Sequence, residues 1–268
     1  MVDRHLRARF RKKIVDMVCS GKDGHIPSAF SILEIVTALY QNILRVDPMS
    51  PNDEDRDVFI LSKGHGCLAL YVNLHNRGFI TEEDLSQFCQ FGGILGEHPD
   101  CNKIPGVEAN TGSLGHGIAF AIGRALGSKI QRKANRVFVV VGDGECQEGS
   151  VWEAANIASN QKLGNVCVLI DRNGSSTQLM PIEDLVARWR AFGWEAIELD
   201  GHDIDEIVKQ TNKIDFSNDI PTALICNTIK GYGAECLTGH GMWHHRIPND
   251  VEYKQIMTDI ESWEHELT

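Results

Sequence analysis

Two oxygen-bearing side chains follow apolar runs in the middle of this chain. Asp143 comes after the run 137–141, and Asn173 comes soon after a second run, 166–170. If both runs are strands joined by a helix, they are parallel and their carboxyl ends lie at the same sheet edge. Mg²⁺ prefers oxygen ligands and commonly shares them with phosphate groups. The pair therefore predicts a diphosphate held through a divalent metal.

The glycines beside Asp143 fit the same chemistry. Gly142 and Gly144 allow the backbone to approach a phosphate closely, and the helix that follows offers free N–H groups to an anion. Taken alone, Gly-Asp-Gly and Asn173-Gly174 are both common turn sequences. Their separation by one helix, between matched strands, favours a site. A dinucleotide site is disfavoured because no G-x-G-x-x-G follows the first strand.

The elements that must carry these residues alternate regularly from about residue 115 onward. The patterns predict helices 115–130, 150–161, 182–192 and 204–213 and strands 137–141, 166–170, 194–199 and 222–227. Such alternation with continuously apolar strands predicts an α/β fold, a mostly parallel sheet flanked by helices. The strand 57–61 is expected to join this sheet. No linker or repeat interrupts the pattern, so we expect residues 1–268 to form one domain.

Amphipathic helices are expected on either side of this region, at 4–19, 31–44, 66–76 and 250–267. Ser31 and Glu34 match the capping-box pattern, which predicts that the second of these helices begins at Ser31. The basic run Arg4–Lys13 carries apolar residues at helical spacing. We interpret it as a solvated helix face rather than a phosphate-binding arm.

The composition excludes several classes of protein. The net charge of −11 over 268 residues disfavours a nucleic-acid-binding surface. The eight cysteines include no C-x-x-C pair, which fits small buried side chains in a reducing compartment. The first residues are charged, and no apolar run approaches the ~20 residues that span a bilayer. We therefore expect a cytoplasmic protein that does not bind membranes.

Four further blocks, each with a histidine, lie in the first half of the chain. They are GHIPS (24–28), SKGHG (62–66), GEHP (96–99) and TGSLGHG (111–117). With GDGECQEGSVWEAANIASNQKLGNVCVLIDRNG (142–174), they resemble transketolases, and the GDG…N spacing resembles the thiamine-diphosphate-binding motif. The resemblance covers essentially the whole chain. It corresponds to the N-terminal third to half of a full transketolase, the diphosphate-binding domain, which some families encode as a separate polypeptide.

The resemblance implies a role for each matching residue. Asp143 and Asn173 would ligate Mg²⁺ or Ca²⁺ together with the backbone carbonyl of Ser175. The catalytic histidines would be His25, His98 and His244, near the reacting carbons of the donor sugar, where imidazoles can exchange protons at neutral pH. The residues that would bind thiamine diphosphate are His65, Gly112, Ser113, Leu114, Gly142, Asp143, Gly144, Glu145 and Asn173.

The resemblance also implies a partner. In the family, a glutamate from a pyrimidine-binding domain activates the cofactor, and we expect that domain, with a C-terminal domain, on a second subunit in an α₂β₂ assembly. The implied reaction transfers a two-carbon ketol unit from a ketose, a phosphate ester or a modified sugar, to an aldose. Other thiamine-diphosphate enzymes, of the 1-deoxyxylulose-5-phosphate synthase or 2-oxo acid dehydrogenase type, remain alternatives. So does a catalytically silent binding module.

Two loops depart from the family pattern. SSTQLMP follows Gly174, and His245 stands where transketolases of this type have the glycine of Trp-His-Gly. Both loops are expected near the substrate entrance, which argues against the ordinary pentose phosphate as the only candidate and leaves a modified ketose as an alternative. His240, His244 and His245 have spacing that could bind zinc, but neighbouring glycines and a proline argue against the helix that this site needs. The roles of His116, His240 and His245 remain open.

Overall fold

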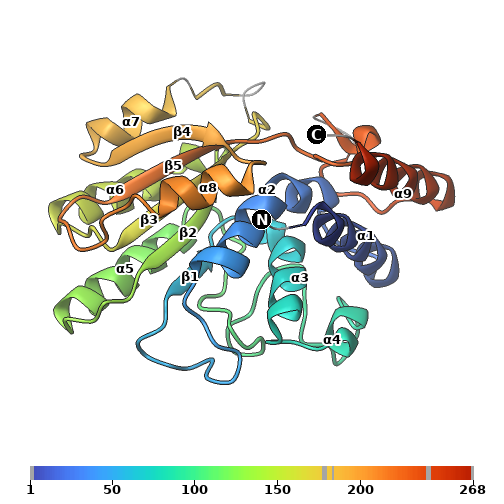
Figure 1. The fold of residues 1–268 in the computed structure, drawn as a ribbon, viewed down its shortest axis with the longest axis horizontal. Coiled ribbons are helices and arrows are strands. Elements are labelled where there is room, and N and C mark those ends of the chain that lie inside the picture. The colour runs from blue at the N-terminus through green and yellow to red at the C-terminus, as the bar shows by residue number, and fades with distance from the viewer. Residues whose placement is uncertain (1–2, 177–179, 183, 240–242, 267–268) are drawn as a thin grey trace.

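Five parallel strands form the central layer of the molecule in the computed structural model, which describes residues 3–176, 180–182, 184–239 and 243–266 (Figure 1). The strands are β1 (Val58–Leu61), β2 (Val137–Gly142), β3 (Val166–Arg172), β4 (Glu195–Asp200) and β5 (Thr222–Asn227). Their order across the sheet is β1-β2-β3-β5-β4. Each predicted strand is present, including the one expected at 57–61, and the prediction of a parallel α/β sheet is confirmed.

Helices cover both faces of this sheet because its strands are apolar on both sides. On β2, Phe138 and Val140 pack toward one core, whereas Val137, Val139 and Val141 pack toward the other. The first core is covered by α1 (Arg4–Gly21), α2 (Ile26–Ala38), α3 (Cys67–Arg77), α8 (Ile204–Thr211) and α9 (Asp250–His265). The second is covered by α5 (Gly117–Ile130), α6 (Gly149–Asn160) and α7 (Leu185–Ala191). A short helix, α4 (Glu82–Ser86), was not predicted.

The strand order reverses between β3 and β5. From β3 the chain passes through α7 to the edge strand β4 and returns through α8 to β5. The segments that leave β3 and β5 lead to helices on opposite faces, α7 and α9, and a hollow lined by Asn173, Asn227 and Thr228 lies outside the carboxyl ends of these strands. Open α/β sheets bind their ligands at such a reversal. Asp143, Asn173 and Thr228 follow β2, β3 and β5, so the fold places them at this position.

The capping-box prediction at Ser31 and Glu34 is wrong. The helix α2 begins at Ile26, with Pro27 in its first turn, where proline's fixed φ angle suits a helix start. A π-helical turn, Leu39–Ile43, continues it. Ser31 and Glu34 are fully buried inside α2, and their side chains bind other elements instead of the helix terminus. The pattern of Ser31 and Glu34 is typical of a helix start, but here the two side chains make contacts with residues far away in the chain.

The prediction that Arg4–Lys13 forms a solvated face is wrong at Arg11. This side chain is fully buried, with its Nη2 atom 2.7 Å from Glu34 Oε1, and its Nε donates to the carbonyl of Tyr232. His202 Nδ1 lies 3.1 Å from the other oxygen of Glu34. Burial would raise the pKa of Glu34, but the Arg11 charge and the His202 hydrogen bond outweigh it and lower that pKa to about 2.

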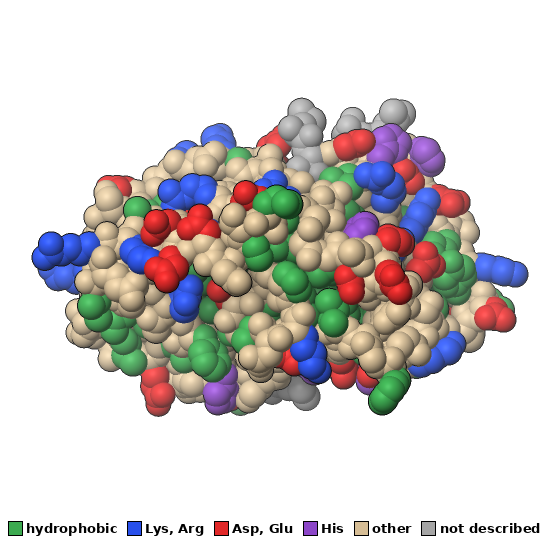
Figure 2. Space-filling view, turned by 90° about the horizontal axis from the view of Figure 1, so that it is seen from below, with side chains coloured by type: hydrophobic (Ala, Val, Ile, Leu, Met, Phe, Trp, Pro, Cys, Tyr) green, Lys and Arg blue, Asp and Glu red, His purple; other side chains and the backbone are tan. Residues whose placement is uncertain are grey.

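The structure also shows how charged side chains are distributed on the surface and where the cysteines lie. Acidic and basic side chains are interspersed on the face that Figure 2 shows. All eight cysteines lie in the described part of the chain and are free thiols, four of them buried. Within that part, none of the helices combines the length and the apolar character that crossing a bilayer requires.

We expect Glu34→Gln to destabilise the fold strongly, because it leaves the buried Arg11 charge without its counter-ion. Breaking a buried ion pair in this way costs about 3–5 kcal/mol. Urea unfolding followed by circular dichroism measures the loss. The low pKa of Glu34 stabilises the folded state above its ordinary value of 4.5, and this contribution is lost as the pH falls toward 2. The difference in the free energy of unfolding between the wild type and the variant should therefore become smaller as the pH falls from 4.5 toward 2.

The matched control is Glu266→Gln, which removes an exposed partner of Arg4. Exposed pairs contribute roughly 0–1 kcal/mol, so this variant should unfold almost like the wild type. Equal effects of the two substitutions would contradict a structural role for the buried pair.

Candidate active site

Asp143 and Asn173 lie together at the carboxyl ends of β2 and β3, as their spacing predicts. Both carboxylate oxygens of Asp143 accept backbone hydrogen bonds, Oδ1 from Gly144 at 2.7 Å and Oδ2 from Gly174 at 2.6 Å. Gly174 belongs to the loop after β3, so this side chain joins the two loops. The strand pairing thus brings residues about thirty positions apart into one site.

The oxygen atoms at this edge fit a hard divalent cation. Asn173 Oδ1 accepts a hydrogen bond from the Ser175 backbone N–H at 2.9 Å, which fixes the turn that carries the predicted Ser175 carbonyl ligand. Asp143, Asn173 and Thr228 line a hollow of about 330 Å³ with Ser176, whose buried hydroxyl oxygen has no hydrogen-bond partner among the described residues. Mg²⁺ and Ca²⁺ take carboxylate, amide and carbonyl oxygens. The residues present are therefore a suitable set of ligands.

The electrostatics of Asp143 point the same way. Burial raises the pKa of this carboxyl group, and the negative charge of Asp171 raises it further. Two buried carboxylates close together favour a cation between or beside them, because each ionised group destabilises the other. A divalent metal would offset both effects.

A second buried carboxylate, Asp171, was missed by the sequence reasoning. Lys63 Nζ lies 2.5 Å from its Oδ2 atom, and Ser31 Oγ donates to Oδ1 at 2.7 Å. The hydroxyl of Thr228 and the amide of Asn173 also donate to this carboxylate. An ionisable residue at the end of an otherwise continuously apolar strand was the available signal. Lys63, also unpredicted, lies inside one of the histidine blocks.

Three of the predicted histidines form a cluster near this edge. The ring centroid of His25 lies 5.3 Å from that of His65 and 5.1 Å from that of His244, and the last two are 6.1 Å apart. Burial, with the charge of Lys63, lowers the pKa of His65 to about 2. Burial, with the charge of Lys230, lowers the pKa of His244 to about 4. These two rings are therefore neutral at physiological pH.

Hydrogen-bond partners indicate which nitrogens of two of these rings carry protons. His25 Nδ1 lies 2.7 Å from the carbonyl oxygen of His244 and therefore carries a proton, whereas its Nε2 lies 3.0 Å from the Glu97 carboxylate. His244 Nδ1 lies 2.9 Å from Lys230 Nζ and accepts from the ammonium group, which leaves the proton on Nε2. The cluster thus offers a donor nitrogen at His244 and, at His25, a nitrogen that shares its proton with a carboxylate. Lys230, a buried residue that the sequence reasoning missed, sets the second assignment.

His98 lies apart from this trio, against the loop that contains Gly112. A Cβ atom added to Gly112 would be 3.0 Å from the His98 ring, and the φ angle of Gly112 is +151°, so a glycine suits the position. A Cβ added to Gly64 would lie 2.9 Å from the Gly112 nitrogen. The predicted cofactor segment 112–114 therefore packs between His98 and the turn that holds His65.

Glu145, predicted to bind the cofactor, has its carboxylate engaged within the protein. Its Oε1 accepts from Ser62 Oγ at 2.5 Å and from the Gly115 backbone at 2.8 Å, and its Oε2 accepts from the Gly142 backbone at 3.1 Å. The side chain is buried. It fixes the positions of three loops around the site.

The histidines whose roles the sequence leaves open, His116, His240 and His245, differ in their surroundings. His116 precedes α5, and its Nδ1 lies 3.0 Å from the carbonyl of Leu114 in its own loop. His245 Nε2 lies 2.8 Å from Asp23 Oδ1. His240, which the zinc alternative needs, lies outside the described residues.

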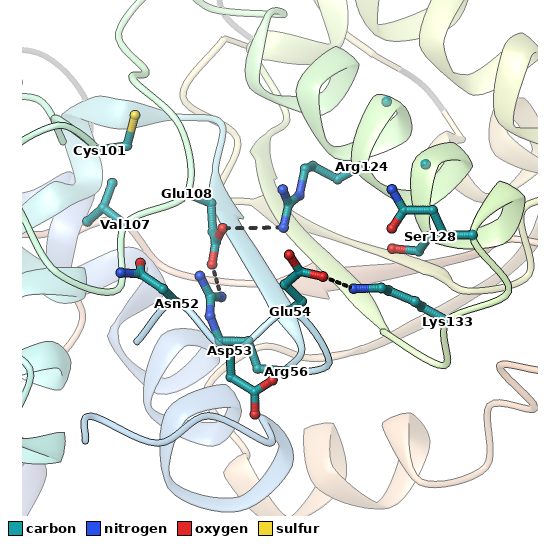
Figure 3. Close-up of a pocket in the computed structure, with 13 residues that line it drawn as sticks. Asn52, Asp53, Glu54, Arg56, Cys101, Val107, Glu108, Arg124, Ser128 and Lys133 are labelled. Atoms are coloured by element: carbon teal, nitrogen blue, oxygen red, sulfur yellow. Dashed lines mark hydrogen bonds and ion pairs between the residues drawn. The ribbon is translucent and has the colours of Figure 1, made fainter. Parts of the chain in front are cut away.

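A larger hollow of about 480 Å³ lies between the loop 52–56 and α5 (Figure 3). Figure 3 shows that its labelled basic side chains are paired with carboxylates, Arg56 and Arg124 with Glu108 and Lys133 with Glu54. None of the predicted site residues lines it. We therefore place the candidate active site at the sheet edge.

Comparisons with known proteins agree with this geometry. A family model described as the thiamine diphosphate binding domain of transketolase matches residues 2–261. An apulose-4-phosphate transketolase subunit from Phocaeicola vulgatus is 39% identical over 255 residues, covering 93% of this chain and 90% of that protein. The 6-deoxy-6-sulfo-D-fructose transketolase subunit SqwG of a Clostridium species is 35% identical over 243 residues, covering 89% and 88%.

Solved transketolase structures share the fold. The transketolase from Leishmania mexicana superposes with a TM-score of 0.89 at 27% sequence identity. The match covers 96% of this chain and 41% of that longer chain, so this chain spans about two-fifths of that transketolase. The family model, the relatives and the shared fold together show that the chain belongs to the transketolase family, in which it corresponds to the thiamine-diphosphate-binding domain.

Proposed function

We propose that this chain, acting with a second subunit, transfers a two-carbon ketol unit from a ketose to an aldose, using thiamine diphosphate and Mg²⁺ or Ca²⁺. The observation that supports this most is the placement of Asp143 and Asn173 on adjacent strand ends, beside the cluster of His25, His65 and His244. Residues 1–268 form one diphosphate-binding domain in this proposal. The free cysteines fit a cytoplasmic location.

In this proposal Asp143, Asn173 and the Ser175 carbonyl hold the metal, and backbone groups near Gly142 and Gly144 face the diphosphate. His65 and the segment 112–114 contact the cofactor on the other side. Thiamine diphosphate, when bound, supplies a nucleophilic thiazolium carbon that acts as an electron sink. The surrounding residues bind and orient the reactants, and Glu145 keeps three of the loops in place.

The histidines divide the proton transfers between them. His25 Nε2 faces the Glu97 carboxylate, so the two groups together can take a proton from a donor hydroxyl group. His244 carries its proton on Nε2 and can donate a hydrogen bond to a substrate oxygen. His98 is the third predicted contact with the sugar. We infer that Lys230 is a positioning residue, because it fixes the tautomer of His244.

The exposed face of α5 and α6 supports a partner subunit. Phe120 on α5 and Ile157 on α6 are 55% and 49% exposed. Cβ atoms added to Gly123 or Gly127 would meet nothing within 4 Å. Glycine inside a helix costs about 1 kcal/mol relative to alanine, so an exposed and a partly exposed glycine on one helix favour close approach by another backbone. We propose that the second subunit, with the pyrimidine-binding and C-terminal domains, covers this face in an α₂β₂ assembly.

The relatives favour a modified ketose as the donor. One is named for apulose 4-phosphate and another for 6-deoxy-6-sulfo-D-fructose, so both names refer to ketoses that carry an anionic group. We propose the same chemical class for this chain. In full transketolases the remaining three-fifths of the chain lies beyond the matched domain. We therefore propose that the groups recognising the anion lie largely on the partner subunit.

We expect Mg²⁺ with thiamine diphosphate to raise the melting temperature of the reconstituted complex by several degrees. A ligand at 100 times its Kd stabilises the folded state by about 2.7 kcal/mol. Asp143→Asn should abolish the shift, because it removes a carboxylate ligand from the metal. Asp219→Asn, at an exposed ion pair with Lys162, should keep it. A full shift in the Asp143 variant would contradict the metal assignment.

Ketol transfer should require both subunits. We expect no transfer by this chain alone and transfer when the partner is added, measured by coupled detection of the aldose product. Phe120→Glu should weaken association, because it places a charge at the centre of the apolar face. Analytical ultracentrifugation detects this loss, and Val251→Glu, at an exposed position of α9 on the opposite face of the sheet, is the matched control. Transfer by the isolated chain would refute the two-subunit proposal.

A further inference from the structure

Three side chains that commonly ligate metals converge beside the histidine cluster. His25 Nε2 lies 3.0 Å from Glu97 Oε1, and His245 Nε2 lies 3.4 Å from the same oxygen. The three atoms are all within 4.8 Å of one another. Zinc bonds of about 2.0–2.2 Å in a tetrahedral site separate neighbouring ligand atoms by about 3.4 Å. The observed spacing therefore suits one metal ion bound by two imidazoles and a carboxylate.

The hydrogen bond on the other side of His25 supports this arrangement. Because its Nδ1–H donates to the His244 carbonyl, Nε2 is the ring nitrogen that faces Glu97, at 3.0 Å. A proton holds these two atoms together in the metal-free protein, and a metal ion that binds both replaces it. A backbone carbonyl on the far nitrogen is also the partner that orients histidine ligands in metal sites.

Two of the three ligands come from well-anchored backbone. His25 immediately precedes α2, and 12% of its side chain is exposed. The segment carrying Glu97 is held to α3, since Cys67 Sγ donates to the Glu97 carbonyl at 2.9 Å and Tyr71 donates to the Gly96 carbonyl at 2.9 Å. Such support keeps ligands in place before a metal arrives.

The third ligand is the residue that distinguishes this chain from the transketolase pattern. His245 is 53% exposed, so solvent and ions can reach it. Asp23 Oδ1 lies 2.8 Å from its Nε2 atom and can supply a fourth ligand. Glycine at position 245 would offer no ligand.

We propose that His25, Glu97 and His245, with Asp23, form a binding site for a divalent transition-metal ion of the Zn²⁺ class. Imidazole ligands favour Zn²⁺, Co²⁺ or Cu²⁺ over Mg²⁺, which distinguishes this site from the oxygen-only set at Asp143. The functional consequence rests on the proposed transketolase activity. A metal bound to His25 Nε2 and Glu97 occupies both groups that otherwise take the substrate proton, so a bound metal inhibits ketol transfer.

Titration of the full chain with Co²⁺ in excess Mg²⁺ tests the site directly. We expect one Co²⁺ per chain, with the visible absorption bands of nitrogen-ligated cobalt, and competition by Zn²⁺. His245→Gln and Glu97→Gln should each weaken binding by more than about tenfold, the lower end of the 10–100-fold that losing an outer-shell partner costs. Circular dichroism confirms that the variants are folded. His75→Gln, at a surface histidine paired with Glu82, should bind like the wild type.

The absence of nitrogen-ligated cobalt bands, or wild-type affinity in both His245→Gln and Glu97→Gln, would overturn the proposal. In the reconstituted pair, Zn²⁺ should inhibit ketol transfer, and each variant should be less sensitive relative to its own metal-free rate. Cobalt binding without any ketol transfer would contradict the proposed function and leave the metal site intact. Ketol transfer without cobalt binding would contradict the metal site and leave the proposed function intact.

Discussion

The buried carboxylate of Asp171 is the interaction on which the rest of the candidate site depends. It ends β3 inside the protein, where an ionised group is stable only with partners close by. Those partners come from four elements: Lys63 follows β1, Ser31 lies on α2, Thr228 follows β5, and Asn173 extends β3 itself. Satisfying one carboxylate therefore fixes the relative positions of most of the loops around the hollow.

This arrangement concentrates charge at the strand ends and governs the chemistry of its neighbours. Asp143 is less acidic because it is buried beside Asp171, and this favours a cation at its free oxygen lone pairs. Lys63 and Lys230 have the opposite effect on the imidazoles. Together with burial, their positive charges lower the pKa values of His65 and His244 and keep both rings neutral. A neutral ring can have one donor and one acceptor nitrogen, so the same charges that stabilise the fold also determine which nitrogen of His244 can donate.

Much of the site was predictable because it depends on local sequence. Continuous apolar runs identified the strands, and the polar residues directly after them, Asp143 and Asn173, had to lie at one edge once the strands were parallel. The pattern at Ser31 and Glu34 led to a wrong helix start because the same residue types that cap a helix also bind buried charges. Arg11 was likewise expected in solvent, since helical periodicity does not reveal which charged side chain has a buried partner.

The sequence by itself determined the order and type of the elements, the parallel sheet and the residues that resemble those of transketolases. Only the tertiary structure decided which side chains meet: Asp171 with Lys63, Arg11 with Glu34, and His245 with Glu97. The physical reason is that strand periodicity is encoded over a few neighbouring residues. Pairing of buried charges depends on contacts between residues far apart in the chain, which the packing of helices on the sheet brings together.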